Sequence, residues 1–450
     1  MIDFLLERFA THAAGDAIVW NETAYSYGWL LNRIREWRTT ILQSGIAPGA
    51  VVAVEADFSP ASVALLLALT EHNSILVPMT SSVEAMKPEF REIAEVEIVV
   101  QINASDQFTI QRSDFAASHP YYQTLRERGH PGLVLFSSGS TGKSKAAVHD
   151  LTHLLDKFKA ERAQRRSISF LLFDHIGGIN TMLYAFSNGG CLIAVGDRSP
   201  DGVLRAVENH RADLLPTSPT FINLILLSEA HTRHDLKTLK TVTYGTEPMP
   251  ASTLQRFHEL FPQITLQQTY GLSEVGILRS KSKSSDSLWV KVGGEGFRTR
   301  VVDGILQIRA QSAMLGYLNA VNPFTEDGWF NTGDSVQVDG DYLMILGRMS
   351  EIVNVGGEKV YPAEVESVIQ EMSEVAEVTV FGEKNAITGQ IVCAKVRLMP
   401  GIEIAPKPFE LKLKTYCRSR LASFKVPSKV RLEADEQYSG RFKKVRSHLA

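Results

Sequence analysis

The sequence is poor in cysteine. Its 450 residues contain only Cys191, Cys393 and Cys417, which are scattered and odd in number. So few thiols exclude a disulfide framework and a zinc-binding spacing, and they are typical of a reducing compartment. We therefore expect a cytoplasmic protein.

Signals for a membrane or a nucleic acid are also scarce. No apolar run approaches the ~20 residues that span a bilayer, and the start, MIDFLLERFATHAAGDA, lacks the pattern of a signal peptide. Residues 401–450 carry twelve Lys and Arg against five Asp and Glu, within a chain of net charge −3. No aromatic-rich or zinc-bearing motif accompanies this charge, so we expect no nucleic-acid partner. The basic segment is either a solvated face or a small domain that closes over phosphates or meets an acidic carrier.

The chain is long enough for two or three domains, and 44% of its residues are apolar. Apolar residues recur at helical spacing from Trp29 to Trp37, whereas VVAVEA (51–56) and SILVPM (74–79) are typical of buried strands. Strands that alternate with helices predict a layered α/β fold.

A loop rich in Ser, Thr, Gly and Lys follows the apolar run Leu133–Phe136. Such a loop turns backbone N–H groups and hydroxyls toward a bound anion, and its glycines allow close approach. A helical pattern after Asp150 predicts a strand–loop–helix unit that binds phosphate. The candidate residues are Ser137, Ser138, Gly139, Ser140, Thr141, Gly142 and Lys145.

Two other interpretations of this loop remain open. A flexible Ser/Gly loop is one of them. The other is the P-loop of kinases and ATPases, whose end fits Gly142, Lys143 and Ser144, although its opening glycine would have to stand at Ser137. That pattern fails by one residue.

Residues Ser137 to His149 resemble the phosphate loop of the adenylate-forming superfamily, which includes acyl-CoA synthetases, luciferases and nonribosomal peptide adenylation domains. Ser144 replaces a usual proline and Ala146 a usual glycine, while Lys145 and His149 stay in register. The resemblance continues to the C-terminus with about seven motifs in order. It implies a large N-terminal domain of stacked sheets and helices, residues 1–347, and a small α+β lid, residues 348–450.

The next motif contains an expected buried strand, Phe170–Phe173, followed by Asp174, His175 and Gly178. It resembles the family's F-H-x-x-G, which implies that His175 lines the carboxylate pocket. In amino-acid-activating relatives an aspartate holds the substrate's ammonium group, but we expect Asp174 to cap the turn. An apolar helix, 221–227, corresponds to the family's acyl-pocket wall and favours an apolar or aryl acid.

Three further motifs concern the nucleotide. The segment Tyr244–Pro248 resembles the turn that reads adenine, with Gly245, Thr246 and Glu247 as candidates. In YGLSE, Tyr270 can stack on a base, Gly271 lets the backbone pass, Ser273 stands for a usual threonine, and Glu274 offers oxygen to Mg²⁺ together with Thr141. Asp334 and Arg348 match the ribose contacts, and residues 279–287 are expected to form a surface loop.

The C-terminal motifs concern movement and charge. Ser350 occupies the family's hinge position, and Gly356 and Gly357 match a motif that implies a narrow thiol tunnel. The terminal lysine of the family matches Lys443 best, then Lys444, then Arg441.

Together these matches imply an AMP-forming acid–thiol ligase. ATP, with Mg²⁺, would activate a carboxylic acid to an acyl-adenylate, and a thiol of coenzyme A would accept the acyl group. The alternatives are an enzyme that loads an acyl or amino acid onto the phosphopantetheine of a carrier protein, an amino-acid activator that uses Asp174, and a nucleotide-binding protein without catalysis.

Overall fold

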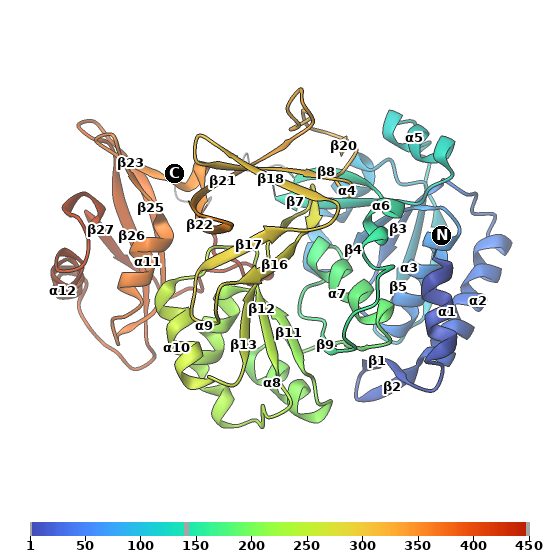
Figure 1. Cartoon of the computed structure of the whole chain (residues 1–450), viewed down its shortest axis with the longest axis horizontal. Helices are drawn as coiled ribbons and strands as arrows, with labels where there is room; N and C mark the ends of the chain where they lie inside the picture. Colours follow the sequence, from blue (N-terminus) through green and yellow to red (C-terminus); the bar gives the residue numbers. More distant parts are fainter. Residues whose placement is uncertain (1, 139–143, 447–450) are drawn as a thin grey trace.

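The computed structural model describes residues 2–138 and 144–446. A large N-terminal region contains three sheets, and a smaller region with a sheet of its own lies beside it (Figure 1). This arrangement confirms the predicted α/β class. No helix among the described residues is long and apolar enough to cross a membrane.

Two seven-stranded sheets form the body of the N-terminal region. The first has the order β13-β12-β11-β9-β10-β1-β2 and the second β20-β8-β7-β4-β3-β5-β6. The strands of the first sheet are β1 Asp16–Trp20, β2 Thr23–Ser26, β9 Arg166–Ile168, β10 Cys191–Ile193, β11 Leu214–Thr217, β12 Thr241–Tyr244 and β13 Thr265–Gln268. Those of the second are β3 Val51–Glu55, β4 Ile75–Met79, β5 Ile98–Ile102, β6 Phe108–Arg112, β7 Gly132–Ser138, β8 Ser144–Asp150 and β20 Gly316–Tyr317.

Helices pack between and around these sheets. The N-terminal helices are α1 Asp3–Thr11, α2 Tyr27–Gln43, α3 Pro60–Glu71, α4 Lys87–Ile93, α5 Pro120–Arg128, α6 Leu151–Asp156, α7 Ile176–Ser187, α8 Pro200–Asn209, α9 Pro219–Ser228 and α10 Ala251–Leu260, with short 3₁₀ turns at η1 Ser81–Met86 and η2 Ala230–Thr232. All residues of α3 except Glu71 are buried, as expected for an apolar helix between two sheets. The hydrophobic core around α3 contains side chains from both sheets, such as Ile18 of β1 and Val52 of β3.

Two expected elements differ from the structure. The phosphate loop connects β7 to an antiparallel strand, β8, and only then does α6 begin. The expected strand–loop–helix unit is therefore wrong, because residues 144–150 pair with β7 as a strand before the helix begins. The expected strand over 170–173 is also wrong, since β9 ends at Ile168 and the buried residues that follow are loop.

The third sheet has the order β16-β17-β22-β21-β19-β18, and a small hairpin, β14–β15, lies apart from it. Its strands are β16 Arg279–Ser282, β17 Trp289–Gly293, β18 Phe297–Val302, β19 Ile305–Ala310, β21 Phe330–Asp339 and β22 Tyr342–Arg348; the hairpin is β14 Gly271–Leu272 and β15 Gly276–Ile277. The expected loop over 279–287 begins instead as strand β16. Its serines pack against the body, because Ser280 and Ser282 accept backbone hydrogen bonds from Tyr270 and Gln268.

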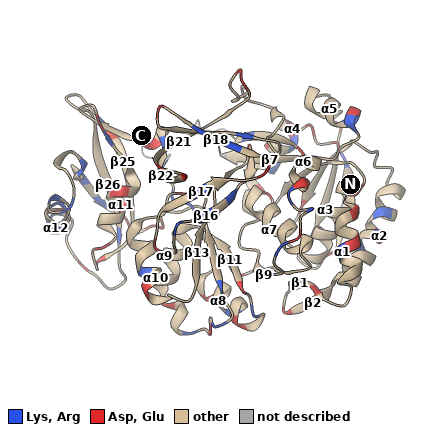
Figure 2. Cartoon of the chain, in the orientation of Figure 1, with Lys and Arg blue, Asp and Glu red and all other residues tan. Residues whose placement is uncertain are grey.

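The C-terminal region begins after a 3₁₀ turn, η3 Met349–Glu351, which contains Ser350. Its elements are β23 Val353–Val355, β24 Glu358–Val360, α11 Pro362–Ile369, β25 Val375–Asn385, β26 Gly389–Leu398, α12 Pro406–Arg418, η4 Ser423–Lys425 and β27 Lys429–Leu432. Several Lys and Arg lie on α12 (Figure 2). The last described segment, Tyr438–Arg446, returns to the N-terminal region and is called the tail below.

Candidate active site

One large cleft gathers most of the predicted site residues. It has a volume of about 1310 Å³ and lies between the N-terminal sheets and the tail. The predicted residues that line it are Ser137, His175, Gly245, Thr246, Glu247, Tyr270, Gly271, Ser273, Glu274, Asp334, Arg348 and Lys443. Side chains separated by some three hundred residues thus share one cavity.

The centre of the phosphate loop cannot be placed in this cleft, because Gly139, Ser140, Thr141 and Gly142 lie outside the described residues. Its two stems are described. They pair in register, with Ser137 opposite Lys145 and Ser138 opposite Ser144. The Lys145 ammonium lies 5.3 Å from the centre of the Tyr317 ring.

Glu274 is held by neighbours on both sides. The Tyr317 hydroxyl donates to its Oε1 at 2.5 Å, and its carbonyl accepts from the Met314 N–H at 2.7 Å. His149 lies 2.5 Å from the Ser273 carbonyl through Nε2, and burial lowers the pKa of His149 to about 4. The ring is therefore neutral at pH 7, and its Nε2–H donates to that carbonyl. Sequence matching kept His149 in register but did not reveal that it positions the Glu274 loop.

A metal cluster made of protein ligands alone is absent from the described part of the chain, where no group of three or more His, Cys, Asp or Glu side chains could hold an ion. Glu274 supplies a single carboxylate. A single protein carboxylate fits Mg²⁺, because this ion is commonly bound by one or two carboxylates together with substrate phosphates.

Asp334 forms the second polar centre of the cleft. It lies opposite Arg348 in the β21–β22 register, and its Oδ1 is 3.2 Å from the Arg348 Nε. The Tyr270 hydroxyl donates to Oδ2 at 2.5 Å. Burial raises the pKa of Asp334, while Arg348 and Tyr270 oppose that shift. The tyrosine therefore orients the acid through its hydroxyl, a contact that sequence reasoning did not predict.

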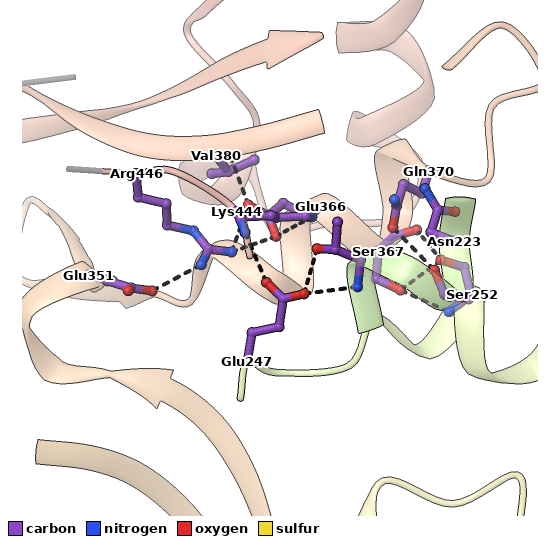
Figure 3. Close-up of polar contacts among 12 residues, drawn as sticks. Asn223, Glu247, Ser252, Glu351, Glu366, Ser367, Gln370, Val380, Lys444 and Arg446 are labelled. Atoms are coloured by element: carbon purple, nitrogen blue, oxygen red, sulfur yellow. Dashed lines mark hydrogen bonds and ion pairs between the residues drawn. The ribbon is translucent and has the colours of Figure 1, made fainter. Parts of the chain in front are cut away.

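The segment expected to read adenine forms a tight turn. Thr246 adopts φ +74°, and a Cβ at Gly245 would lie 2.7 Å from the Thr269 carbonyl, which explains the glycine. The Glu247 side chain is already engaged. It accepts from the Thr220 N–H at 2.8 Å and from the Lys444 N–H at 3.1 Å (Figure 3).

The expectation that Asp174 caps its turn is wrong. His175 is the N-cap of α7, where its Nδ1 accepts from the Gly177 N–H at 3.0 Å. Asp174 is buried, accepts from the Thr80 hydroxyl at 2.7 Å and pairs with Arg441 of the tail at 3.0 Å. The aspartate therefore joins the N-terminal region to the tail.

The tail is anchored on both sides of Lys443. Phe442 adopts φ +53° and lies 5.2 Å from the rings of Phe170 and Phe221, centre to centre. The Ser218 hydroxyl donates to the Phe442 carbonyl at 2.7 Å. Two neighbouring tail cations bind acids of the C-terminal region: Lys444 binds Glu366, and Arg446 binds Glu366 and Glu351 (Figure 3).

Lys443 differs from the other tail cations because its ammonium forms no hydrogen bond or ion pair with any described residue. Burial lowers the pKa of Lys443 to about 8; Glu247 opposes this shift, and Arg441 and Arg348 add to it. A half-buried cation in a cleft that pairs with no described residue has the charge and the free N–H groups to bind an anion.

Three predicted features do not line the cleft, and the first is Lys145 at the stem of the phosphate loop. Gly356 and Gly357 form an exposed turn between β23 and β24 and do not line it. The apolar side chains of α9 do not line it either. They pack in the core of the first sheet, as Phe221, Ile222 and Leu224 do. The prediction that this helix forms a wall of the acyl pocket is therefore wrong.

Comparison with known proteins gives two family matches. A model described as AMP-binding enzyme matches residues 6–317, and one described as AMP-binding enzyme C-terminal domain matches residues 364–440. An indoleacetate–CoA ligase of Aromatoleum aromaticum is 26% identical over 471 residues, which cover 92% of this chain and 90% of that protein. A feruloyl-CoA synthase of an Amycolatopsis species is 26% identical over 94% of this chain and 92% of its own length.

Three further curated ligases match over less of their length, since the chain spans between 57% and 62% of them. Among solved structures, the anthranilate CoA ligase AuaEII in complex with anthranoyl-AMP superposes with a TM-score of 0.80 at 18% identity, covering 99% of this chain and 95% of that one. At this identity the likeness concerns the fold alone.

Proposed function

This chain belongs to the AMP-binding enzyme family, and we propose that it activates a carboxylic acid with ATP and transfers the acyl group to coenzyme A. In the first step the carboxylate attacks the α-phosphorus of ATP, so that pyrophosphate leaves and an acyl-adenylate forms. In the second, a thiol attacks the acyl carbon and AMP leaves. The observation that carries the proposal is the Lys443 ammonium, which pairs with no described residue and lies in a cleft shared with Glu274 and Asp334.

The residues have separate tasks in the first step. Two anions must meet when the acid attacks ATP, so positive groups have to neutralise the charge that develops. Lys443 supplies one such group beside His175, and Lys145 lies at the stem of the phosphate loop. Asp334 accepts from the ribose hydroxyls, with Tyr270 and Arg348 holding its two oxygens. Mg²⁺ on Glu274 and Thr141 would add positive charge at the phosphates.

The second step requires the C-terminal region to move. The turn at Gly356 and Gly357 lies on the surface in this arrangement, whereas Lys443 lies in the cleft. Rotation about Ser350 would withdraw Lys443 and bring the glycine turn to the acyl-adenylate, so that a thiol passes along backbone without side chains. Such a movement separates two reactions in one site.

Coenzyme A fits this chain better than a carrier protein. The basic residues of the C-terminal region are largely paired with acids of the same region, as in Lys412 with Glu374 and Lys425 with Glu364. Paired charges leave little net field for an acidic carrier. The free state of all three cysteines is consistent with a cytosolic enzyme.

An amino acid fits the cleft less well than a simple acid. An ammonium group would need the Asp174 carboxylate, but Arg441 already pairs with this aspartate and Thr80 donates to it. The charge that would bind the substrate amine is therefore neutralised by the tail.

ATP–pyrophosphate exchange over a panel of aryl, short-, medium- and long-chain acids, with amino acids included, tests the proposal. We expect exchange that requires Mg²⁺ and a carboxylic acid, and a thioester when coenzyme A is added. A parallel assay with a holo carrier protein in place of coenzyme A identifies the acceptor. ATP binding without exchange for any acid would leave only the nucleotide-binding alternative.

A further inference from the structure

A second lysine that forms no ion pair with a described residue also lines the cleft. Lys157 follows the end of α6 and lines the same cavity as Lys443. Its ammonium donates to the Asn180 Oδ1 at 2.6 Å and to the Ile277 carbonyl at 2.8 Å, both neutral acceptors. An ammonium has three N–H donors, so one remains for a ligand.

Two exposed arginines act on the charge of this lysine. Arg162 and Arg279 line the cleft too, and neither forms an ion pair with a described residue. Burial lowers the pKa of Lys157 to about 7, and the charges of Arg162 and Arg279 lower it further. We call these three residues the distal cluster.

The acids of the cleft do not compensate this charge. The acidic residues among its described lining are Glu247, Glu274, Asp334 and Glu351. All of them act on the cations of the nucleotide end, namely Lys443, Arg348 or Arg446. Within the described residues no acid therefore compensates the half-buried charge of Lys157, while Arg162 and Arg279 are exposed at the edge of the site. Withdrawing the charge of such a lysine from water is costly unless a ligand pairs with it.

Helix α7 connects the two ends of the cleft. His175 caps its start near Lys443, and Asn180, which binds Lys157, lies five residues further along. At 1.5 Å per residue this separation is ~7.5 Å, the length of an aryl acid. Apolar side chains of Leu171, Ile176 and Ile277 also line the cavity.

We propose that the distal cluster binds an anionic group at the far end of the acid substrate, so that the enzyme prefers acids with an apolar or aryl body and a second carboxylate or sulfonate. This inference rests on the proposed function and specifies its substrate class. When the carboxylate to be activated lies beside Lys443 and His175, the second anion accepts the free N–H of Lys157 in a charge-assisted hydrogen bond. Arg162 and Arg279 add to the attraction.

Pyrophosphate exchange with three matched acids tests the proposal: 4-carboxycinnamate, its 4-methyl ester and cinnamate. We expect kcat/KM for the dicarboxylate to exceed that for the ester at least ~10-fold, through KM. Lys157→Met removes the charge and keeps the length of the side chain, so it should lower this preference ~10- to 100-fold. Lys157→Arg should retain part of it.

The matched control is Lys159→Met, because Lys159 is exposed and pairs only with Asp156 nearby. It should leave the preference unchanged. If Lys157→Met slows all three acids equally, the lysine only tethers α6 to α7 and the inference is overturned. If it changes only KM for coenzyme A in the thioester assay, the cluster binds a phosphate of coenzyme A and the inference is likewise overturned. Absence of exchange with every acid would instead refute the proposed function.

Discussion

Lys443 and Lys444 are neighbours in the sequence, but their side chains have opposite surroundings. The Lys444 ammonium is 2.9 Å from the Glu366 Oε2, whereas the Lys443 ammonium has no partner among the described residues and lies in the cleft. Phe442, held between Phe170 and Phe221, fixes the direction in which each lysine leaves the tail. One lysine therefore anchors the tail and the other is free for a substrate.

Replacement of Lys443 should separate catalysis from binding. We expect Lys443→Ala to lower the rate of acid-dependent pyrophosphate exchange by roughly 10²–10³-fold, because an electrostatic contact of the transition state is lost. The Kd for ATP, measured by calorimetry, should change less than ~5-fold, since Arg348, Asp334 and the phosphate loop remain. Lys359→Ala, an exposed lysine of β24, is the control. Equal losses in rate and in ATP affinity would argue against a transition-state role.

The loss of activity at alkaline pH should follow the deprotonation of Lys443. Its pKa is lowered to about 8, and a lysine is charged below its pKa, so the positive charge is lost as the pH rises through 8. We expect kcat/KM for ATP in pyrophosphate exchange to fall ~10-fold per pH unit above that value. Lys443→Arg keeps its charge at high pH and should remove the fall. A wild-type profile that stays flat to pH 10 would contradict this assignment.

Glu366 should stabilise the tail in a pH-dependent way. Burial alone would raise its pKa, but Arg446 and Lys444 outweigh burial and lower the pKa of Glu366 from 4.5 to about 2. A lowered acid pKa adds stability above the unfolded value, so ~3 kcal/mol is present at pH 7 and is lost as the pH falls from 4.5 toward 2.

Urea unfolding followed by circular dichroism measures this contribution. Glu366→Gln leaves two cations without their buried acid and should lower the free energy of unfolding at pH 7 by ~3 kcal/mol or more. Glu410→Gln breaks a partly exposed pair with Lys414 on α12 and should cost less than ~1 kcal/mol. Similar losses for the two variants would show that Glu366 contributes no more to stability than a partly exposed acid does.

A side chain on the glycine turn should affect the thioester step alone. Gly357 has φ +94°, and no atom lies within 4 Å of the position that a Cβ would occupy. Gly357→Leu should therefore fold with local strain and leave pyrophosphate exchange within ~3-fold. After rotation of the lid the leucine would stand in the path of the thiol, and thioester formation should fall at least ~10-fold. Gly401→Leu is a matched control, because Gly401 also has a positive φ and open space. If both variants behave alike, the turn does not line a tunnel.

The family was predictable because it depends on residue types in a fixed order. The prediction of an adenylate-forming protein is confirmed by the family matches, and that of a two-part α/β fold by the structure and its neighbours. The strands over 51–55 and 75–79 were also found, since runs of apolar residues of that length are buried strands in a layered fold.

The errors have a common physical origin. Asp174 was expected to cap its turn because the x-x-G that follows it is of the acyl-CoA synthetase type, yet its partners, Thr80 and Arg441, are 94 and 267 residues away. Residues 279–287 were expected to form a loop because they are poor in side chains that can pack, yet residues 279–282 pair with β17. For Asp174 segments far along the chain decided the conformation, whereas for residues 279–282 pairing with the next strand did.

The sequence by itself determined the fold family, the order of the motifs and the set of three tail cations from which the catalytic one comes. Only the tertiary structure decided that Glu366 pairs with Lys444 and Asp174 with Arg441, while Lys443 pairs with no residue of the described ranges. The tertiary structure also decided that Lys157 forms no ion pair with a described acid, which its neighbours in the sequence do not reveal. The reason is that composition and spacing record which charges a chain carries, whereas the partner of each buried charge depends on which distant segments pack beside it.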